Sequence, residues 1–314
     1  MTSSPPRNPE KIDQRQRTRL LIGRLWVDSL TQHSALAALA QLVADGRGGA
    51  VFTPNVDHIV TAESNAALRR AYRRASLTFA DGAPVIWASW LLRPRLPEKL
   101  SGSDMVWPIA KLAAERGWRV YLLGGGQGSA VEAAVRLRAT AGVNVVGTDD
   151  AQVSMHADPV SDAAILERIH QARPHLILVG LGAPKQELFI DRMAKELAPA
   201  VSIGVGASID FIAGRLRRSP EWMSKFGLEW LFRLQQEPQR LWKRYLIKDP
   251  RFVWLVLRTM RLPRARRVCH LPFHDVPFAD LQIVDLHGRG LLVPAPSRGA
   301  GESEEPVRGD GCAA

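Results

Sequence analysis

Short, continuously apolar runs alternate with longer amphipathic stretches over most of this 314-residue chain, and no other feature limits its fold as strongly. Six of the apolar runs are candidate strands: Ala50–Thr53, Leu77–Ala80, Arg119–Leu123, Val143–Gly147, Leu176–Gly180 and Val201–Val205. Strands that are apolar on both faces and separated by helices form parallel sheets covered on both sides. The sequence therefore predicts an α/β fold, a doubly wound, Rossmann-like, mostly parallel sheet.

The amphipathic stretches between these runs have the spacing of helices that bury one face. Seven helices are predicted: Ser34–Val43, Val56–Arg74, Pro84–Leu92, Ser103–Arg116, Ser129–Thr140, Asp162–Ala172 and Gln186–Leu197. Both faces of the predicted sheet are thereby covered.

Composition divides the chain into four segments. Residues 1–19 are polar and proline-rich, which is typical of a disordered arm, and residues 20–213 hold the α/β domain. Residues 214–267 form a basic, tryptophan-rich helical appendage, and residues 268–314 are rich in proline, glycine and histidine, as flexible tails are. We expect a chain without residues 214–267 to remain soluble and folded but nearly inactive.

The positive charge of the chain is concentrated in one segment. The formal net charge is +11, and the segment between Gly214 and His270 holds 15 Lys and Arg against 4 Asp and Glu, which is the whole excess. Such a block indicates contact with phosphates, whether of nucleic acid, anionic lipid or a phosphorylated substrate. Its many aromatic residues favour a helix at a membrane interface, although a solvated basic face over an aromatic core stripe is equally consistent with the pattern.

Three arginines of this segment, Arg233, Arg240 and Arg244, fall on one face of a continuous helix, with Pro238 as an interruption. Guanidinium groups bind phosphate in bidentate fashion and stay charged. The chain contains no D-x-D, zinc or Walker motif, so we predict neither a metal nor a cofactor. No signal peptide and no run of roughly 18 apolar residues is present, which predicts a cytoplasmic or peripheral protein.

Glycine-containing loops follow three of the predicted strands, at the edge where open α/β sheets bind ligands. The first, LLGGGQGS, contains Gly124 and Gly126 and opens a helix, so its backbone N–H groups could hold a phosphate. Asp149 and Asp150 lie at about the distance of a ribose-binding acid. A tight turn with a helix cap explains the same residues, and glycines that only relieve crowding explain the loops GLGAPKQE and GVGASID.

Two polar residues close the first two predicted strands. Asp81 is a carboxylate that can serve as a general base, and it is equally a candidate N-cap for the helix that begins near Pro84. Asn55 has the same two interpretations before the helix that begins at Val56. Local sequence does not decide between them.

Seven motifs together resemble the WecG/TagA/CpsF glycosyltransferases, glycosyltransferase family 26, over about Leu20 to Leu257. They are Thr53-Pro-Asn-Val-Asp57, Ala80-Asp-Gly82, Ser101-Gly-Ser-Asp104, the GGGQG loop, GLGAPKQE, GVGASIDFIAG and EWLFRLQQEPQRLWKRY from Glu229 to Tyr245. The resemblance implies inverting, metal-independent transfer of a sugar from a UDP-sugar to a polyprenyl-diphosphate-linked sugar at the cytoplasmic membrane face, in bacterial surface or exopolysaccharide synthesis. The tail after about Val268 extends beyond the family pattern.

The resemblance also implies roles for individual residues. Asp81 corresponds to the general base, and Thr53 is a neighbour of the reacting groups. The diphosphate would be held by the arginines Arg233, Arg240 and Arg244. Substrate or nucleotide would contact Asn55, Asp104, Gly124, Gly126, Gln186 and Asp210.

The implied partners are therefore a UDP-sugar donor, a polyprenyl-diphosphate-linked acceptor and an anionic membrane surface, with no nucleic acid; a homo-oligomer stays open. Two other functions remain as alternatives. The glycine loop with Asp149 and Asp150 suits a NAD-dependent Rossmann-fold oxidoreductase, and the basic aromatic segment suits a nucleic-acid-binding module.

Overall fold

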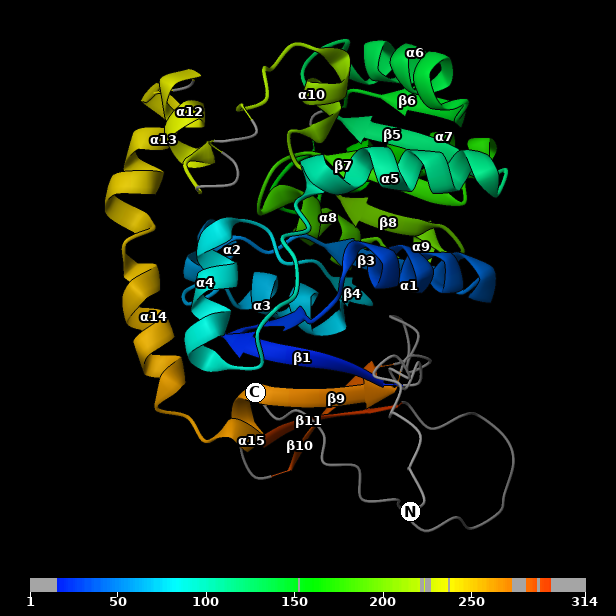
Figure 1. Ribbon diagram of the computed structural model, residues 1–314. Coiled ribbons are helices and arrows are strands. Elements are labelled where there is room, and N and C mark those ends of the chain that lie inside the picture. Colours follow the sequence, from blue (N-terminus) through cyan, green and yellow to red (C-terminus); the bar gives the residue numbers. More distant parts are fainter. Residues whose placement is uncertain are drawn as a thin grey trace, which may run out of the picture.

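The structure is a computed structural model that describes residues 16–151, 153–220, 223, 227–236, 238–272, 281–286 and 289–294. A six-stranded sheet lies at its centre (Figure 1). All six predicted strands are present: β3 (Gly49–Phe52), β4 (Leu77–Thr78), β5 (Arg119–Gly124), β6 (Asn144–Asp149), β7 (Leu176–Gly180) and β8 (Val201–Gly204). They pair in parallel in the order β4-β3-β8-β7-β5-β6, which confirms the predicted α/β fold.

Helices cover both faces of this sheet, and each face has its own core. One core packs against α1 (Gln32–Asp45), α5 (Gly102–Glu115), α6 (Ser129–Ala141) and α10 (Ser208–Ala213). The other packs against α2 (Val56–Thr61), α3 (Ala66–Arg74), α4 (Ala83–Leu92), α7 (Pro159–Ala172), α8 (Lys185–Arg192) and α9 (Ala194–Leu197). Neighbouring residues of a strand enter opposite cores, as Val51 and Phe52 do, because strand side chains alternate between faces.

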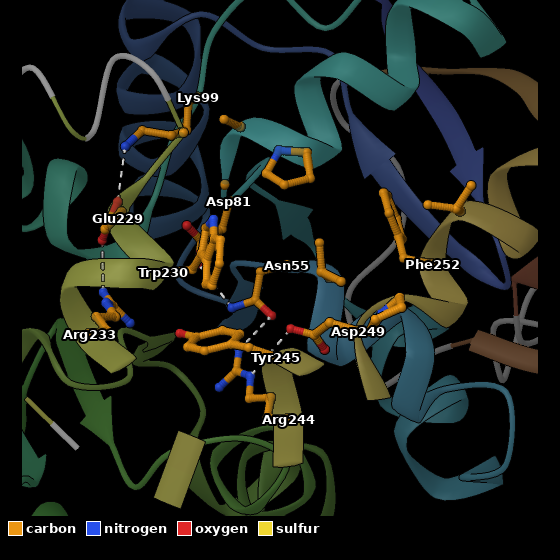
Figure 2. Close-up of a pocket in the computed structure, with 17 residues that line it drawn as sticks. Asn55, Asp81, Lys99, Glu229, Trp230, Arg233, Arg244, Tyr245, Asp249 and Phe252 are labelled. Carbon is orange, nitrogen blue, oxygen red and sulfur yellow. Dashed lines mark hydrogen bonds and ion pairs between the residues drawn. The ribbon is translucent and has the colours of Figure 1, made fainter. Parts of the chain in front are cut away.

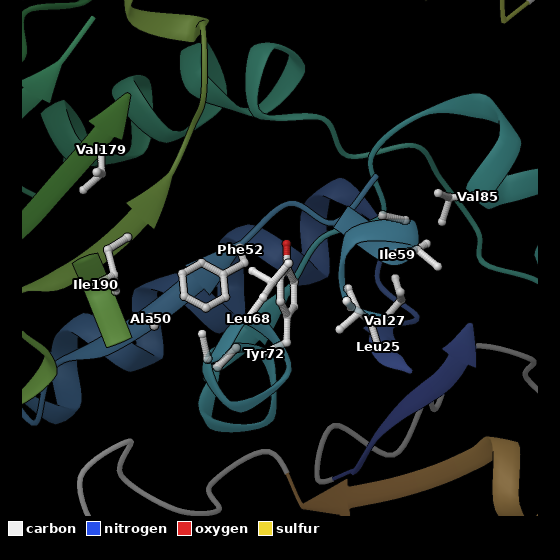
Figure 3. Packing of buried hydrophobic residues seen from close by; sticks show 14 of the residues in the cluster. Leu25, Val27, Ala50, Phe52, Ile59, Leu68, Tyr72, Val85, Val179 and Ile190 are labelled. Carbon is white, nitrogen blue, oxygen red and sulfur yellow. The ribbon is translucent and has the colours of Figure 1, made fainter. Parts of the chain in front are cut away.

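Two predicted helices are each divided in the structure. The stretch Val56–Arg74 forms α2 and α3, because Asn65 accepts a hydrogen bond from the Leu68 N–H and caps a new helix. The stretch Gln186–Leu197 forms α8 and α9, which meet at Met193. In the core below β3, the ring of Tyr72 from α3 lies 5.2 Å from that of Phe52 (Figure 3).

A second, antiparallel sheet was not predicted. It consists of β1 (Gln16–Ile22), β2 (Leu25–Asp28) and β9 (Val268–Pro272), in the order β2-β1-β9. The predicted arm over residues 1–19 and tail over residues 268–314 therefore both differ from the structure where they overlap β1 and β9. A hairpin of β10 (Leu281–Leu286) and β11 (Arg289–Pro294) also lies within the predicted tail. The remainder of the arm and tail, including residues 1–15, lies outside the described residues.

The second sheet helps to position β4, from which the loop to α4 departs. Asp28 at the end of β2 accepts hydrogen bonds from the Thr78 N–H at 2.7 Å and the Thr78 hydroxyl at 3.0 Å. Arg19 of β1 pairs with the same carboxylate at 3.0 Å. Beyond β4, the Asp81 N–H donates to the Pro54 carbonyl at 3.1 Å. The segment with Asp81 is thus held beside the segment that follows β3.

The C-terminal helices run along one side of the molecule (Figure 1). They are α12 (Glu229–Gln236), α13 (Pro238–Lys243), the π-helix η1 (Arg244–Lys248), α14 (Arg251–Met260) and α15 (Arg264–Arg267). Phe252, Leu255 and Val256 of α14 are buried in the core that also holds α2 and α4. Because α14 and β9 pack on the α/β domain, the structure does not support a separable appendage whose loss would leave that domain intact. Among the described helices, none has the length and apolarity needed to cross a bilayer.

Candidate active site

The larger of two neighbouring cavities lies over the carboxyl ends of β3, β4, β7 and β8, the edge where open α/β sheets bind ligands. Its volume is about 560 Å³. Thr53 and Gln186, both predicted site residues, line it. The Thr53 hydroxyl donates to the Gly204 carbonyl at 3.3 Å, and the buried Gln186 accepts from the Gly206 N–H at 3.0 Å. These two side chains therefore join the ends of the strands that form the cavity floor.

The smaller cavity, of about 330 Å³, lies between the start of α4 and the C-terminal helices (Figure 2). Trp230, Tyr245 and Phe252 give it aromatic walls, and Pro84 and Val253 add apolar surface. Lys99, Glu229 and Asp249 supply charge. This cavity combines apolar walls with a few charged groups, a composition common in sites for amphipathic ligands.

Four residues line both cavities and so mark where they meet: Asn55, Asp81, Arg233 and Arg244. The residues come from the segment after β3, the segment after β4, α12 and η1, which are distant in sequence. Asp81, Arg233 and Arg244 were predicted to act on one substrate, and the structure brings these three residues together. Any reaction between a ligand in one cavity and a ligand in the other would take place beside them.

Asp81 is half-buried at this junction. Burial and the nearby charge of Glu229 raise the pKa of its carboxyl, while Arg233 and a hydrogen bond from Asn55 partly oppose that rise. A carboxylate with a raised pKa accepts a proton more readily than an ordinary one. The alternative role as a helix cap does not match the structure, because the N-cap of α4 is Gly82 and no side chain caps that helix.

Asn55 does cap α2, and it also reaches Asp81. Its Oδ1 accepts from the N–H groups of Asp57 at 3.1 Å and His58 at 3.4 Å. Its Nδ2 donates to Asp81 Oδ2 at 3.2 Å. The two interpretations of Asn55 left open by the sequence are therefore compatible, because the two ends of one amide serve different partners.

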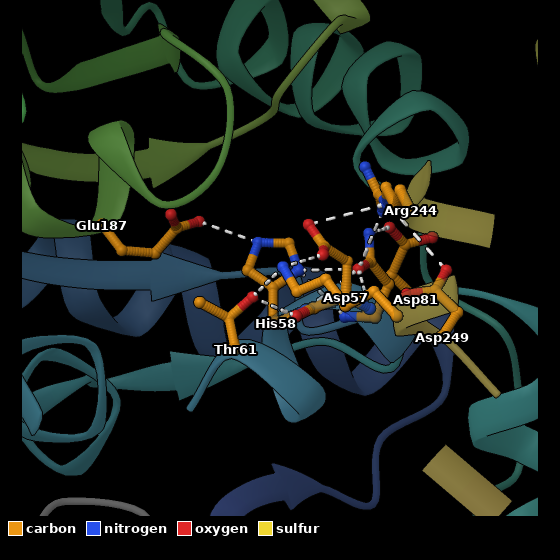
Figure 4. Close-up of polar contacts among 9 residues, drawn as sticks. Asp57, His58, Thr61, Asp81, Glu187, Arg244 and Asp249 are labelled. Carbon is orange, nitrogen blue, oxygen red and sulfur yellow. Dashed lines mark hydrogen bonds and ion pairs between the residues drawn. The ribbon is translucent and has the colours of Figure 1, made fainter. Parts of the chain in front are cut away.

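Arg244 occupies the first residue of the π-helix, a local irregularity often found at functional sites. Its Nη2 donates to Asn55 Oδ1 at 3.3 Å, and its Nε lies 3.6 Å from Asp57 Oδ2 and 4.0 Å from Asp249 Oδ2 (Figure 4). Lys248, one turn further on, pairs with Asp57 at 2.5 Å. Burial raises the pKa of Asp249 to about 6, against the opposing charge of Arg244. The C-terminal helices are thus tied to α2 at the cavity junction.

Arg233 approaches the junction from α12. Its Nη2 donates to Glu229 Oε1 at 3.0 Å, and its guanidinium lies over the Phe211 ring at 5.4 Å. The Nε atoms of Arg233 and Arg244 are both buried and have no hydrogen-bond partner among the described residues. Buried donors without partners are uncommon in folded proteins. Arg244 Nε faces the carboxylates of Asp57 and Asp249, and both arginines can meet a ligand because their side chains line the two cavities.

Other predicted site residues lie elsewhere. The carboxylate of Asp104 accepts from Ser101 at 2.6 Å and pairs with Lys99 at 3.0 Å and with Arg218. Although burial acts to raise its pKa, these partners hold the pKa of Asp104 below its usual range. Asp104 lines neither cavity, so it belongs to the support of the site rather than to its surface.

The glycine loop after β5 also lies outside both cavities, and its polar groups have internal partners. The Gly126 N–H donates to Asp210 at 2.8 Å, and the Gly128 N–H donates to Asp150 at 3.0 Å. A Cβ at Gly124 would lie 2.8 Å from the Gly180 carbonyl oxygen, so glycine there permits close packing of two strand ends. Gly124, Gly126 and Asp210 therefore line neither cavity, and their ligand contacts stay a prediction.

The two acids on which the dinucleotide alternative rests, Asp149 and Asp150, both have partners within the protein. Asp150 is engaged with the glycine loop, and Asp149 pairs with Arg168 at 2.6 Å. The backbone of Arg240 lies in α13, but its side chain lies outside the described part of the structure. Within the described residues, no group of three or more His, Cys, Asp or Glu side chains is arranged to hold a metal ion.

Several site residues were not predicted. Lys99, Glu229 and Asp249 line the smaller cavity, and His58 lines the larger one. Glu229 lies 3.5 Å from Lys99 and so links it to Arg233. His58 directly follows the motif Thr53–Asp57, and Glu229 begins the motif Glu229–Tyr245, so their positions next to these motifs could have pointed to them. Lys99 and Asp249 are single charged residues without such a signal.

The chain also matches a known protein family. The model of the Glycosyl transferase WecG/TagA/CpsF family matches residues 20–267. The match includes every residue that lines the two cavities.

Proposed function

The chain belongs to the WecG/TagA/CpsF glycosyltransferase family, whose members act in cell-surface polysaccharide synthesis, and we propose that it transfers a sugar from a UDP-sugar to a polyprenyl-diphosphate-linked sugar. The transfer inverts the anomeric centre and requires no metal. One observation carries the proposal: Asp81, Arg233 and Arg244 meet where a polar cavity adjoins an apolar one.

The two cavities suit two different substrates. The larger lies at the sheet edge typical of nucleotide sites and is lined by Thr53 and Gln186, so we assign the donor to it. The smaller has aromatic and apolar walls, which suit an acceptor sugar attached to a lipid. With this assignment the reacting atoms meet beside Asp81.

Asp81 is the proposed general base. As the acceptor hydroxyl oxygen forms a bond to the anomeric carbon of the donor, the Asp81 carboxylate takes the hydroxyl proton. The bond between that carbon and the UDP oxygen breaks, and its electron pair leaves with UDP. A positioned base contributes roughly 10²–10⁴-fold to such a rate. The raised pKa of Asp81 suits this role.

Arg233 and Arg244 stabilise the leaving group in this proposal. Negative charge grows on the diphosphate as the bond to the sugar breaks, and fixed positive groups aimed at developing charge often supply the largest part of catalysis. Both arginines line the two cavities where these meet. A diphosphate bound there would accept charge-assisted hydrogen bonds from their guanidiniums.

We also propose that the enzyme works on the cytoplasmic membrane face, in contact with anionic lipid. The buried face of α14 carries Phe252 and Leu255, yet its other face is apolar as well, with Val253 63% and Trp254 57% exposed. Exposed apolar patches of this kind normally mark an interaction surface. Arg251 at the start of α14 is exposed beside this face, as membrane-surface helices require.

Helix α4 extends the same apolar surface. It contacts α14 (Figure 1). Its side chains Trp87, Trp90 and Leu91 are exposed. The starts of α4 and α14 also line the smaller cavity, where Val253 is shared between cavity and surface. An acceptor whose lipid remains in the bilayer would thus reach the cavity from a surface already in contact with the membrane.

The decisive experiment is incubation of the purified chain with a panel of UDP-sugars and a short-chain polyprenyl-diphosphate sugar, with and without EDTA. We expect one donor to give a product heavier by one sugar residue, with inverted anomeric configuration by NMR and an unchanged rate in EDTA. Absence of product with every donor contradicts the proposed substrates, and loss of activity in EDTA contradicts metal independence. A thermal shift with NAD but not with UDP would favour the oxidoreductase alternative.

A further inference from the structure

A buried group of side chains lies behind the catalytic base and has no role in the reaction described above. His58 in α2 is 5% exposed and Glu187 in α8 is fully buried. His58 Nε2 lies 3.2 Å from Glu187 Oε1, and His58 Nδ1 lies 2.8 Å from Asn55 Oδ1 (Figure 4). His58 Nδ1 also accepts a hydrogen bond from the Asn55 backbone N–H at 3.2 Å, so the ring contacts both the backbone and the side chain of Asn55 while Nε2 faces the buried carboxylate.

The contacts of Asn55 determine which way its amide faces. Its Oδ1 is within reach of a donor from Arg244, besides the two α2 N–H groups that it caps. An amide nitrogen in that position would face these three donors, whereas the oxygen accepts from them. The Nδ2 group must therefore point the other way, where it donates to Asp81 Oδ2 at 3.2 Å.

Resting on the proposed function, we infer that His58, held by Glu187, is a positioning residue that acts through Asn55 to aim the Asp81 carboxylate. One Asp81 oxygen is engaged by the amide, so the other is left to receive the acceptor proton. Arg244 contacts the same amide oxygen, which links the orientation of the base to a residue assigned to the leaving group.

The residue types suit this role better than a purely structural one. Burying polar side chains costs desolvation that their mutual contacts only partly offset, so apolar residues would fill the space between α2 and α8 at least as well. Glu187 Oε1 also accepts from Gln186 Nε2 at 2.7 Å, and Gln186 lines the donor cavity. The polar chain thus runs continuously from one cavity wall to the catalytic base.

The charged groups that face Asp81 are Glu229 and Arg233 from α12, Lys99 and, more weakly, His58. Those that face His58 include Glu187 and Asp57. The hydrogen bond from Asn55 lowers the pKa of Asp81, so release of that amide raises it. The same substitution also removes any direct effect of the His58 charge, and the test must separate the two.

The test compares His58→Phe, which keeps the edge-on packing against the Tyr72 ring at 6.0 Å, with Asn55→Ser, which keeps a capping oxygen but lacks the amide donor. The pKa of Asp81 is measured by NMR titration of ¹³C-aspartate-labelled protein and assigned through Asp81→Asn, so the result does not require turnover. We expect either substitution alone to raise the pKa of Asp81, and the double variant to raise it no further than Asn55→Ser.

The kinetic test uses the substrates of the proposed reaction. We expect kcat of His58→Phe to fall at least tenfold with little change in the donor KM, and the acid limb of the pH profile to move to higher pH. His33→Gln, at an exposed histidine of α1, is the matched control with wild-type behaviour. If His58→Phe does not fold, His58→Gln replaces it in both measurements.

Two results would overturn the inference. One is an unchanged pKa of Asp81 in folded His58→Phe. The other is an equal rise in the presence and absence of the Asn55 amide, since that assigns the effect to direct charge and not to positioning. A wild-type enzyme without transfer activity would instead contradict the proposed function, while the NMR titration would still decide on the positioning role.

Discussion

Glu229 and Arg233 lie one turn apart in α12, and the Glu229 carboxylate accepts a hydrogen bond from the Arg233 guanidinium at 3.0 Å. Glu229 therefore pairs with the Arg233 guanidinium, which the proposed reaction assigns to the donor diphosphate. Its charge also raises the pKa of Asp81. One carboxylate thus restrains the arginine that the proposal assigns to the diphosphate and raises the pKa of the aspartate proposed as the general base.

We predict that Glu229→Gln separates these two effects. Loss of the negative charge lowers the pKa of Asp81, so the carboxylate is ionised at lower pH and the acid limb of the kcat/KM profile moves to lower pH. Affinity for UDP rises about 1.4- to 5-fold, because a partly exposed ion pair that competes with the ligand contributes about 0.2–1 kcal/mol. Rate profiles between pH 5 and 8 and calorimetric titration with UDP measure these changes.

The matched control is Glu115→Gln, at an exposed carboxylate of α5. It should leave both the pH profile and UDP affinity as in the wild type. An acid limb that stays in place or moves to higher pH in Glu229→Gln would show that Glu229 does not act on Asp81 in this way.

Asp81→Asn should lower turnover by about 10²–10⁴-fold, since the amide cannot accept the acceptor proton. UDP affinity should stay within about twofold, because Asp81 is assigned to proton transfer and not to nucleotide binding. Single-turnover rates and equilibrium UDP binding measure the two quantities. A variant with wild-type rate would remove Asp81 from catalysis, and the structure offers no helix cap as its alternative role.

The central sheet was predictable because its strands are short, apolar on both faces and separated by amphipathic helices. The second sheet was not, because β1 begins with the polar run Gln16–Arg19 and pairs with β9, some 250 residues away in sequence. No local periodicity indicates such a partner. The sequence placed the domain boundaries at changes of composition, whereas β1 crosses the predicted boundary after residue 19 and β9 forms the start of the predicted tail.

The site was predictable to the extent that its residues follow strands. Asp81 and Asn55 close two strands and so had to lie at the same sheet edge. Gly124 also closes a strand, but its loop satisfies its N–H groups internally, which depends on tertiary contact with Asp210. Glu229 contributes through its distance to Asp81, a property that only the folded chain defines.

Asp249 should make stability depend on pH. Burial raises its pKa to about 6, above the value of about 3.9 in an unfolded chain. Between these values the native state binds more protons, so the free energy of unfolding falls as pH rises through this window. An asparagine at this position cannot ionise, so Asp249→Asn removes this pH dependence. The free energy of unfolding of the variant minus that of the wild type should therefore be about 1–2 kcal/mol larger at pH 7.5 than at pH 4.5.

Urea unfolding of both proteins at these two pH values measures the difference. The exposed Glu115 again provides the control, as Glu115→Gln should change stability equally at both pH values. A stabilisation that does not depend on pH, or one that is larger at pH 4.5, would be inconsistent with a raised pKa at Asp249.

Helix α14 should be essential to the stability of the α/β domain. Leu255 is 2% exposed and belongs to the core shared with α2 and α4, so Leu255→Ala should cost about 2–5 kcal/mol of unfolding free energy. Leu257, two residues further on, is exposed, and Leu257→Ala should cost less than about 0.5 kcal/mol in the absence of membranes. If both substitutions had equally small effects on the free energy of unfolding, the prediction of a separable appendage over residues 214–267 would be supported.

The exposed face of α14 should determine membrane affinity without affecting folding. Trp254 is exposed and packs against the guanidinium of Arg258 at 5.2 Å, so Trp254→Gln should leave thermal stability nearly unchanged. Burial of a large apolar side chain contributes about 1.5–3 kcal/mol, which corresponds to a loss of about 10- to 100-fold in partitioning to vesicles that contain phosphatidylglycerol. Val135→Gln, at an exposed apolar residue of α6, should bind these vesicles as the wild type does. Co-sedimentation measures this, with neutral phosphatidylcholine vesicles to isolate the contribution of the basic residues. Equal binding of Trp254→Gln and Val135→Gln would exclude this face as the membrane contact. If Trp254→Gln alone transfers sugar more slowly to a lipid-linked acceptor while its UDP affinity is unchanged, membrane contact is connected to acceptor delivery.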